Sequence, residues 1–318
     1  MGDRKSKAGV SGSSDRRSPE GMKARLRDAL WTVWMPVAHI AAKGYVAGPH
    51  LTDALRVSEM LARREFGVTL CPWNSPDTPA EQVAETYHAA LRGVPSGALD
   101  WYLSIKAPEI DYSLQLTQTV VAAAGQLGIG VHFDSHGPET ADPTFDLVER
   151  LLPGASPLGC TLPGRWERSL RDAERVREWG VRVRVVKGQW REPGRRERDP
   201  RLGCLEVIEC LAGNAQRVAV ASHDPVLVRD GLTRLLKAGT PCELELLFGL
   251  PMVPVLNVAR ELGVGVRVYV PYGHAWLPYC FTQMARNPRI LWWLIRDMTF
   301  RRSARALAAG MGAASGPA

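Results

Sequence analysis

The chain has 318 residues, of which 45% are hydrophobic and 23% charged, and its formal net charge is +7. This composition is typical of a globular protein with a sizeable core and excludes disorder over most of the length. No apolar run approaches the ~18 residues that a membrane-spanning helix needs, and the first residues lack the apolar core of a signal peptide. We therefore expect a cytoplasmic protein with no membrane span.

Two polar segments carry much of the positive charge, residues 1–17 and residues 191–201. Neither segment interleaves aromatic with basic residues, as a surface for single-stranded nucleic acid would. The six cysteines form no CxxC pair and have no spacing with histidine that would close a zinc site. We expect solvated loops, reduced thiols that are mostly buried, no nucleic-acid partner and no metal.

The ends of the chain differ from its middle. Residues 1–20 are polar, rich in Gly and Ser and without periodicity, which predicts a disordered tail. Two helices, at about 20–35 and 51–63, are expected within residues 21–64 and would pack on a domain that spans 65–300. Residues 301–318 are expected to form a flexible C-terminal tail.

Within the central domain, short apolar or β-branched runs recur, each followed by a helical pattern. The runs are residues 66–71, 99–106, 129–134, 157–162, 181–187, 216–222, 241–247 and 265–270. Apolar residues at three- and four-residue spacing between them predict helices, for example at 79–91, 113–127, 170–179 and 226–236. Alternating strands and helices predict a parallel sheet, and eight such units predict a closed (β/α)8 barrel. An open doubly wound sheet is the alternative.

Barrel enzymes place their active sites on the loops that follow the strands, so polar residues at the strand ends are the candidates. These are Lys106, Asp134, Lys187, His223 and Tyr269. Together with Arg184, the basic members of this set predict a cationic cup, suited to a phosphate-bearing cofactor or an anionic intermediate.

Two other kinds of site are not expected. The pairs Gly128/Gly130 and Gly263/Gly265 precede strands, whereas a dinucleotide-binding fingerprint follows one. His132, Asp134 and His136 could form a metal cluster on paper, but His136 lies beyond the predicted strand and the expected roles of the histidines are in packing and loops.

Several segments resemble motifs of proline dehydrogenases and occur in the same order. Arg184 with residues 185–190 (VVKGQW) resembles the fifth-strand R-x-V-K-G-x-[YW] segment of that family, and residues 104–106 (SIK) resemble an S-[IV]-K strand end. Phe133-Asp134 resembles the segment that carries a buried aspartate, and residues 221–225 (ASHDP) resemble T-H-N. Residues 246–250 (LLFGL) resemble M-L-x-G-M. Residues 267–273 (RVYVPYG), followed by Tyr279, resemble the last strand and the last catalytic helix.

The resemblance implies a noncovalent FAD in the barrel mouth, with Arg184 near the flavin N5. Implied cofactor contacts are Arg184, Val186, Lys187, Gly188, Trp190, His223 and Asp224. Implied catalytic residues are Lys106, Asp134, Arg184, Tyr269 and Tyr279, and implied substrate contacts are Lys106, Tyr269, Tyr279, Thr282, Gln283 and Arg286. Fixed cations suit hydride transfer because they stabilise the negative charge that develops on the acceptor.

The chain departs from the family pattern where the substrate carboxylate would bind. The family carries Y-x-x-R-R-x-x-E on its last helix, whereas Thr282 and Gln283 replace both arginines here and Arg286 replaces the glutamate. A hydroxyl and an amide cannot reproduce a charged bidentate clamp on a carboxylate. The first strand also ends in residues 71–74 (CPWN) instead of D-x-L-G-E, and residues 160–163 (CTLP) lack the expected glutamine.

The preferred function is therefore hydride transfer to FAD from a C–N or N–N bond of an amine or amino-acid-derived substrate, as in secondary metabolism. Its carboxylate would be absent or masked, for example on an acidic carrier protein that the basic surface could dock. The alternatives are a proline or imino-acid dehydrogenase that binds a displaced carboxylate at Arg286 or Arg289, a catalytically silent FAD-binding regulator, and a flavin-free barrel with Lys106 or Lys187 as Schiff-base former. The electron acceptor and the oligomeric state stay open.

Overall fold

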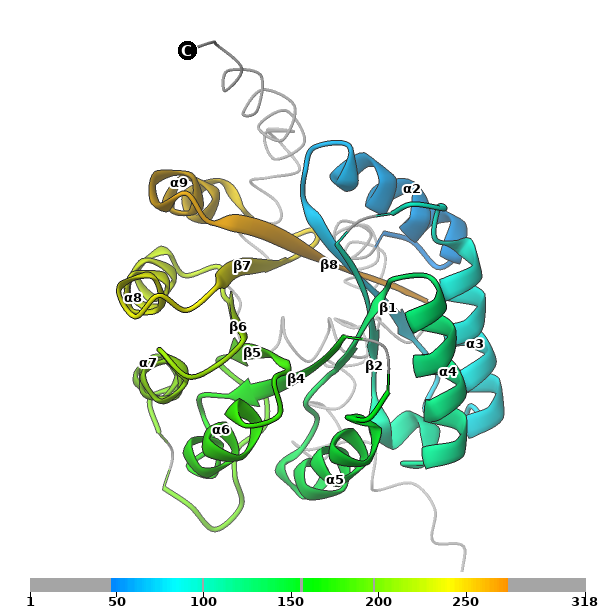
Figure 1. The fold of residues 1–318 in the computed structure, drawn as a ribbon, viewed down its shortest axis with the longest axis horizontal. Helices are drawn as coiled ribbons and strands as arrows, with labels where there is room; N and C mark the ends of the chain where they lie inside the picture. The colour runs from blue at the N-terminus through cyan, green and yellow to red at the C-terminus, as the bar shows by residue number, and fades with distance from the viewer. Residues whose placement is uncertain (1–46, 99, 155–156, 197, 274–318) are drawn as a thin grey trace, which may run out of the picture.

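The computed structural model describes residues 47–98, 100–154, 157–196 and 198–273. Eight parallel strands close into a barrel in chain order (Figure 1). The strands are β1 (Gly67–Trp73), β2 (Trp101–Ile105), β3 (Gly130–Phe133), β4 (Leu158–Pro163), β5 (Arg182–Val186), β6 (Arg217–Ala221), β7 (Cys242–Leu247) and β8 (Gly265–Gly273). The predicted (β/α)8 barrel is thereby confirmed, and the open sheet is excluded.

Helices surround the barrel wall (Figure 1). They are α2 (Leu51–Ala62), α3 (Ala80–Gly93), α4 (Leu114–Gln126), α5 (Ala141–Leu151), α6 (Ser169–Arg177), α7 (Pro200–Leu211), α8 (Pro225–Lys237) and α9 (Val253–Leu262), with 3-10 turns η2 (Ala107–Ile110) and η3 (Pro138–Thr140). The helix predicted at 51–63 is α2, whereas the one predicted at 20–35 lies outside the described residues. No helix in the described part of the chain is long and apolar enough to cross a membrane.

The barrel closes between β1 and β8, and both strands run further than predicted. Their pairing continues through Pro72 and Pro271 to Trp73 and Gly273. The sequence pattern ended at each proline because proline donates no ladder hydrogen bond. Helix α2 packs on this seam, in contact with β1 and β8, so a segment that precedes the barrel covers its closure (Figure 1).

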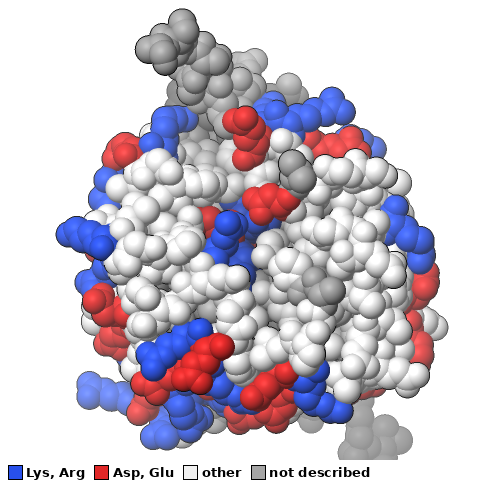
Figure 2. Space-filling view, in the orientation of Figure 1, with Lys and Arg blue, Asp and Glu red and all other residues white. Residues whose placement is uncertain are grey.

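Each strand has an apolar side and a polar side, because successive side chains on a strand alternate. In β5, Val183 and Val185 belong to the buried hydrophobic cluster, whereas Arg182 and Arg184 reach charged partners on other strands across the barrel. Charged side chains are visible at the centre of the face drawn in Figure 2, inside a ring of uncharged residues. The interior of this barrel is therefore packed with polar and ionic groups.

Small residues on β3 and β4 make room for the large ones beside them. A Cβ at Gly130 would lie 2.3 Å from the Tyr102 ring, and a Cβ at Gly159 would lie 2.4 Å from Nδ1 of His132. Alternating small and large side chains fill the interior in this way.

Candidate active site at the barrel mouth

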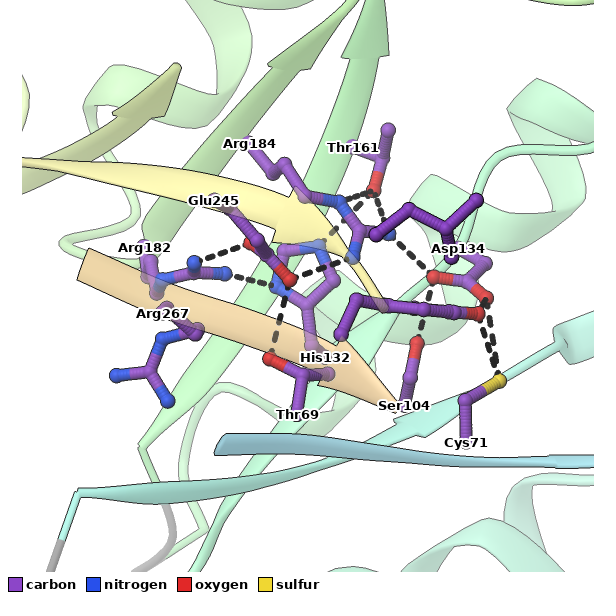
Figure 3. Close-up of polar contacts among 12 residues, drawn as sticks. Thr69, Cys71, Ser104, His132, Asp134, Thr161, Arg182, Arg184, Glu245 and Arg267 are labelled. Carbon is purple, nitrogen blue, oxygen red and sulfur yellow. Dashed lines mark hydrogen bonds and ion pairs between the residues drawn. The ribbon is translucent and has the colours of Figure 1, made fainter. Parts of the chain in front are cut away.

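Asp134 follows β3 and is 8% exposed, as expected for the buried aspartate (Figure 3). Its Oδ1 accepts hydrogen bonds from Ser104 Oγ at 2.5 Å and from Arg184 Nη2, and its Oδ2 accepts from the Tyr269 hydroxyl at 2.7 Å. Burial alone would raise the pKa of Asp134, but the positive charges of Arg184 and Lys106 outweigh it and lower the pKa. Cys71 Sγ also donates to Oδ2, at 3.8 Å, so the residue is a carboxylate that accepts from four side chains.

Arg184 is the centre of the site, and the structure holds its guanidinium from three sides (Figure 3). Besides Asp134, Nη1 donates to Glu245 Oε1 at 3.1 Å, and Nη2 and Nε donate to Thr161 Oγ1 at 2.9 and 3.2 Å. The guanidinium also lies 5.2 Å from the centre of the Tyr269 ring. Arg184 is a buried cation whose orientation is fixed before any ligand arrives.

A second ionic layer lies deeper in the barrel, below Arg184. Arg182 donates to Glu245 and to Glu243, both at 2.5 Å, and Arg267 donates to Glu243 at 3.1 Å. Burial would raise the pKa of Glu245, but Arg182 and Arg184 lower it to about 2. Glu245 thus bridges the two layers as a carboxylate.

His132 lies between these layers as a neutral ring. Arg182 Nη1 is 3.1 Å from Nδ1, and Thr161 Oγ1 is 2.9 Å from Nε2. Because a guanidinium only donates, Nδ1 must accept, and the ring proton is on Nε2 and is donated to Thr161. Burial lowers the pKa of His132, and the charges of Arg184 and Arg182 lower it further.

Lys106 and Cys71 form the β1–β2 side of the mouth. Lys106 Nζ donates to the carbonyl of Pro72 at 2.8 Å and to Cys71 Sγ at 3.5 Å, and it forms an ion pair with Glu109 at 3.6 Å. Burial raises the pKa of Cys71 to about 12, so the thiol is protonated at neutral pH. Cys71 is therefore not an activated nucleophile.

The rim between β5 and β6 carries a second charged group. Asp224 caps α8 and accepts from Lys187 Nζ at 3.0 Å and from Arg201 Nη2 at 2.5 Å. Burial would raise the pKa of Asp224, but these two cations lower it to about 2. Both cations are partly exposed and face the mouth side, where β5 and β6 end.

The segment after β5 needs its glycine. Gly188 has a φ of +86°, and a Cβ there would lie 2.8 Å from the Cβ of Pro163. Two residues on, Trp190 is 36% exposed and stacks on His136 with ring centres 5.6 Å apart. Val186, half-buried at the end of β5, completes this segment.

His223 connects neighbouring loops. Its Nδ1 is 3.0 Å from the carbonyl of Pro251, and its Nε2 accepts from the backbone N–H of Leu247 at 3.0 Å. Both ring nitrogens are thus engaged by the backbone, and the proton is on Nδ1. His223 has the geometry of a structural tie between the β6 and β7 ends.

The expected cationic cup is wrong for the described residues. Arg184 is paired with Asp134 and Glu245, Lys106 with Glu109, and Lys187 with Asp224. The expectation considered the basic residues at the strand ends without the carboxylates that the fold places beside them.

Five of the residues predicted for the site, or weighed for it, lie outside the described residues. They are Tyr279, Thr282, Gln283, Arg286 and Arg289. The structure brings the other predicted residues to two places. Inside the mouth lie Lys106, Asp134, Arg184 and Tyr269. Along the β5, β6 and β7 side lie Val186, Lys187, Gly188, Trp190, His223 and Asp224.

Sequence reasoning missed the charged and hydroxyl partners of this site. The residues missed are Glu109, Thr161, Arg182, Glu243, Glu245 and Arg267. Strict alternation in CELELL (242–247) and VRVRVV (181–186) was the available signal, because charged residues on every second position of a helix-covered strand must face the interior and find opposite charges there.

The cysteines of the described region are free, and most of them are buried, as expected. Cys71, Cys160 and Cys204 are buried and free, and Cys210 and Cys242 are partly buried and free. In residues 47–273, leaving aside the gaps at 99, 155–156 and 197, no group of three or more His, Cys, Asp or Glu is placed to hold a metal ion.

The fold and the site define a (β/α)8 barrel with a preformed ionic site at the end where such barrels hold their ligands. In sequence the chain is similar to proline dehydrogenases. It is 27% identical over 267 residues to proline dehydrogenase 1 of Bacillus subtilis subsp. natto, covering 78% of this chain and 87% of that protein. It is 25% identical over 280 residues to proline dehydrogenase of Deinococcus radiodurans, covering 81% and 89%. No protein-family model matches the chain.

Solved structures show the same fold. Proline utilization A from Bdellovibrio bacteriovorus, inactivated by N-propargylglycine, matches with a TM-score of 0.70 at 16% identity, over 85% of this chain and 35% of that one. Proline utilization A from Corynebacterium freiburgense matches with a TM-score of 0.63 at 14% identity, over 95% of this chain and 35% of that one. The chain thus spans about a third of those longer proteins. The resemblance to proline dehydrogenases predicted from the motifs is confirmed.

Proposed function

We propose that the chain is a flavin-dependent dehydrogenase that oxidises a C–N or N–N bond of an amine whose carboxylate is absent or masked. The observation that carries the proposal is the buried guanidinium of Arg184 at the barrel mouth, fixed by Asp134, Glu245 and Thr161. Similarity to proteins named proline dehydrogenase supports the reaction class.

The residues along the β5 and β6 side of the mouth supply groups that would suit FAD. Lys187 and Arg201 are partly exposed cations that meet on one carboxylate beside the first turns of α7 and α8, a donor set that suits a diphosphate. Gly188 lets the backbone pass close to Pro163, and Trp190 offers a partly exposed ring. With Val186, His223 and Asp224, these residues would hold the cofactor.

FAD, when bound, supplies a two-electron acceptor for a hydride. Arg184 offers a cation that is already oriented and desolvated, so it stabilises negative charge without reorganising. Asp134 keeps that cation in place and accepts a hydrogen bond from the Tyr269 hydroxyl, which fixes the orientation of the Tyr269 ring. Buried Lys106 and the aromatic rings keep water from the reacting bond.

The substrate part of the proposal rests on sequence. Thr282 and Gln283 stand where the related enzymes carry the arginine pair, and a neutral pair suits an amide, an ester or a carrier-bound acyl group. Tyr279 and Arg286 would complete the substrate side, and the basic surface would dock an acidic carrier.

The test is to purify the protein, record its visible spectrum, titrate it with FAD, and then add amines and amino acids anaerobically. We expect flavin bands and their bleaching by an amine but by no simple amino acid. A colourless protein that takes up no FAD would refute the proposal. A yellow protein that no amine bleaches would identify a binding or regulatory protein. Changing Thr282→Arg together with Gln283→Arg is expected to introduce measurable proline turnover.

A further inference from the structure

The charge of Lys106 is fully used inside the protein. A lysine ammonium has three N–H groups. Here two of them make hydrogen bonds to Pro72 and Cys71, and the remaining one faces the carboxylate of Glu109 in the ion pair. Lys106 is 8% exposed, so solvent does not replace these partners. As it stands, Lys106 has no donor to offer to a substrate carboxylate.

Glu109 is held in position and retains access to solvent. It lies on the 3-10 turn η2, directly after β2, and its Oε2 accepts from Asn74 Nδ2 at 2.8 Å. The Asn74 amide comes from the loop after β1, so two loops of the mouth fix this carboxylate. Its side chain is 22% exposed, compared with 10% for that of Lys106. Glu109 is thus the more accessible member of the pair.

The rest of the inner mouth is also balanced in charge. Arg184 is paired with Asp134 and Glu245. Lys106 and Arg184 are thus both ion-paired and buried, whereas Glu109, although paired with Lys106, keeps a partly exposed side that can attract a cationic group. A carboxylate beside an ammonium attracts a second ammonium when that one approaches from the accessible side.

We propose that Glu109 is a specificity-determining residue that neutralises Lys106 and accepts the ammonium group of the substrate, so that the site takes cationic amines without a free carboxylate. This inference rests on the proposed function and names its substrate class. It assigns selectivity to a residue on η2, independently of the residue types at 282 and 283.

The experiment compares two matched substitutions, Glu109→Gln on η2 and Glu139→Gln on the corresponding turn η3 after β3. Glu139 is exposed, and the ion pair of Lys106 is with Glu109, so Glu139→Gln controls for loss of a carboxylate at the mouth. The probes are pyrrolidine, a cationic amine without a carboxylate, and L-proline, which carries one. Calorimetric titration measures the binding of each probe to the protein as purified.

We expect the unsubstituted protein to bind pyrrolidine more tightly than L-proline. Glu109→Gln should weaken pyrrolidine about tenfold and strengthen L-proline, whereas Glu139→Gln should leave the ratio unchanged. Tighter binding of L-proline by the unsubstituted protein, an unchanged ratio in Glu109→Gln, or no pyrrolidine binding at all would overturn the proposal.

A second readout needs neither cofactor nor substrate. Acetylation of Lys106 by acetic anhydride, followed by mass spectrometry, reports how much of its amine is deprotonated. Removal of the Glu109 charge should lower the pKa of Lys106. The acetylation should become about tenfold faster for each unit by which that pKa falls. An unchanged rate would refute the pairing, whereas failure of FAD uptake alone would refute only the proposed redox chemistry.

Discussion

The ionic network has two halves, one deep in the barrel and one at the rim of its mouth, which are built from similar charged residues but differ in exposure to solvent. In the deeper half, Arg182 is 2% exposed and Arg267 is 0% exposed, and both bind carboxylates of β7. At the mouth, the side chains of Lys187 and Arg201 are 43% and 47% exposed, although they too are ion-paired. The deeper pairs therefore fix the position of Arg184, whereas the outer pairs can exchange partners with a ligand.

Replacing one cation by methionine, first in the deeper half and then at the rim, should separate the two halves most clearly. Arg182→Met leaves Glu243 and Glu245 with fewer partners in a dry environment, which should lower the free energy of unfolding by about 3–5 kcal/mol. Lys187→Met removes an exposed partner of Asp224 and should cost less than about 1 kcal/mol. Urea unfolding of both variants measures the two values. Equal costs would contradict the distinction between the two halves.

Acid should weaken the deeper half through Glu245. Its pKa is lowered from the ordinary 4.5 to about 2 in the folded chain. Because the folded-state pKa is the lower one, the stabilisation is complete at pH values above the unfolded-state pKa. It is lost as the pH falls from the unfolded-state pKa to the folded-state pKa. The loss is on the order of 3 kcal/mol. Urea unfolding at a series of pH values should show this loss, and Glu245→Gln should make the free energy of unfolding depend less steeply on pH. An equally steep dependence in that variant would assign the acid sensitivity to another group.

The outer side of the barrel wall followed from the sequence more readily than its inner side. Apolar runs such as residues 181–187 located every strand to within a few residues, because β-branched residues pack against covering helices whatever else the strand carries. The strand ends then identified Lys106, Asp134, Arg184 and Tyr269 as neighbours in the mouth.

The pairing inside the barrel did not follow, since it depends on which inward-facing side chains the fold brings to the same level. Arg184 and Glu245 are 61 residues apart in sequence, yet they are in contact because β5 and β7 flank the same strand, β6. The pairing of Glu109 with Lys106 did not follow either. It depends on the 3-10 turn η2, which brings a residue three positions further along the chain back to Lys106. Alternation predicts that such charges face inward, and only the closed barrel decides which of them meet.

The turn after β5 tests whether the mouth is built for close approach. Gly188→Ala puts a methyl group 2.8 Å from the Cβ of Pro163 at a φ of +86°, so it should cost about 1–3 kcal/mol and reduce FAD uptake. Gly180→Ala is the matched control, because Gly180 has a φ of +63° and no atom within 4 Å of its added Cβ. We expect this control to cost about 1 kcal/mol with normal uptake. Fluorescence titration with FAD measures uptake; equal loss in both variants would indicate strain alone.

The smallest expected change separates helix capping from ligand binding at the rim. Asp224→Ala and Asp199→Ala each remove the cap of a neighbouring helix, α8 and α7, and each should cost about 1 kcal/mol in thermal unfolding. Only Asp224 also accepts from the side chains of Lys187 and Arg201, so its loss frees two cations. Asp224→Ala should therefore bind inorganic pyrophosphate more tightly than the parent protein, and Asp199→Ala should not. If both variants bound pyrophosphate as the parent does, Asp224 would not compete with an anionic ligand for the rim cations. The ion pairs of the rim would then serve stability alone, as those of the deeper half do.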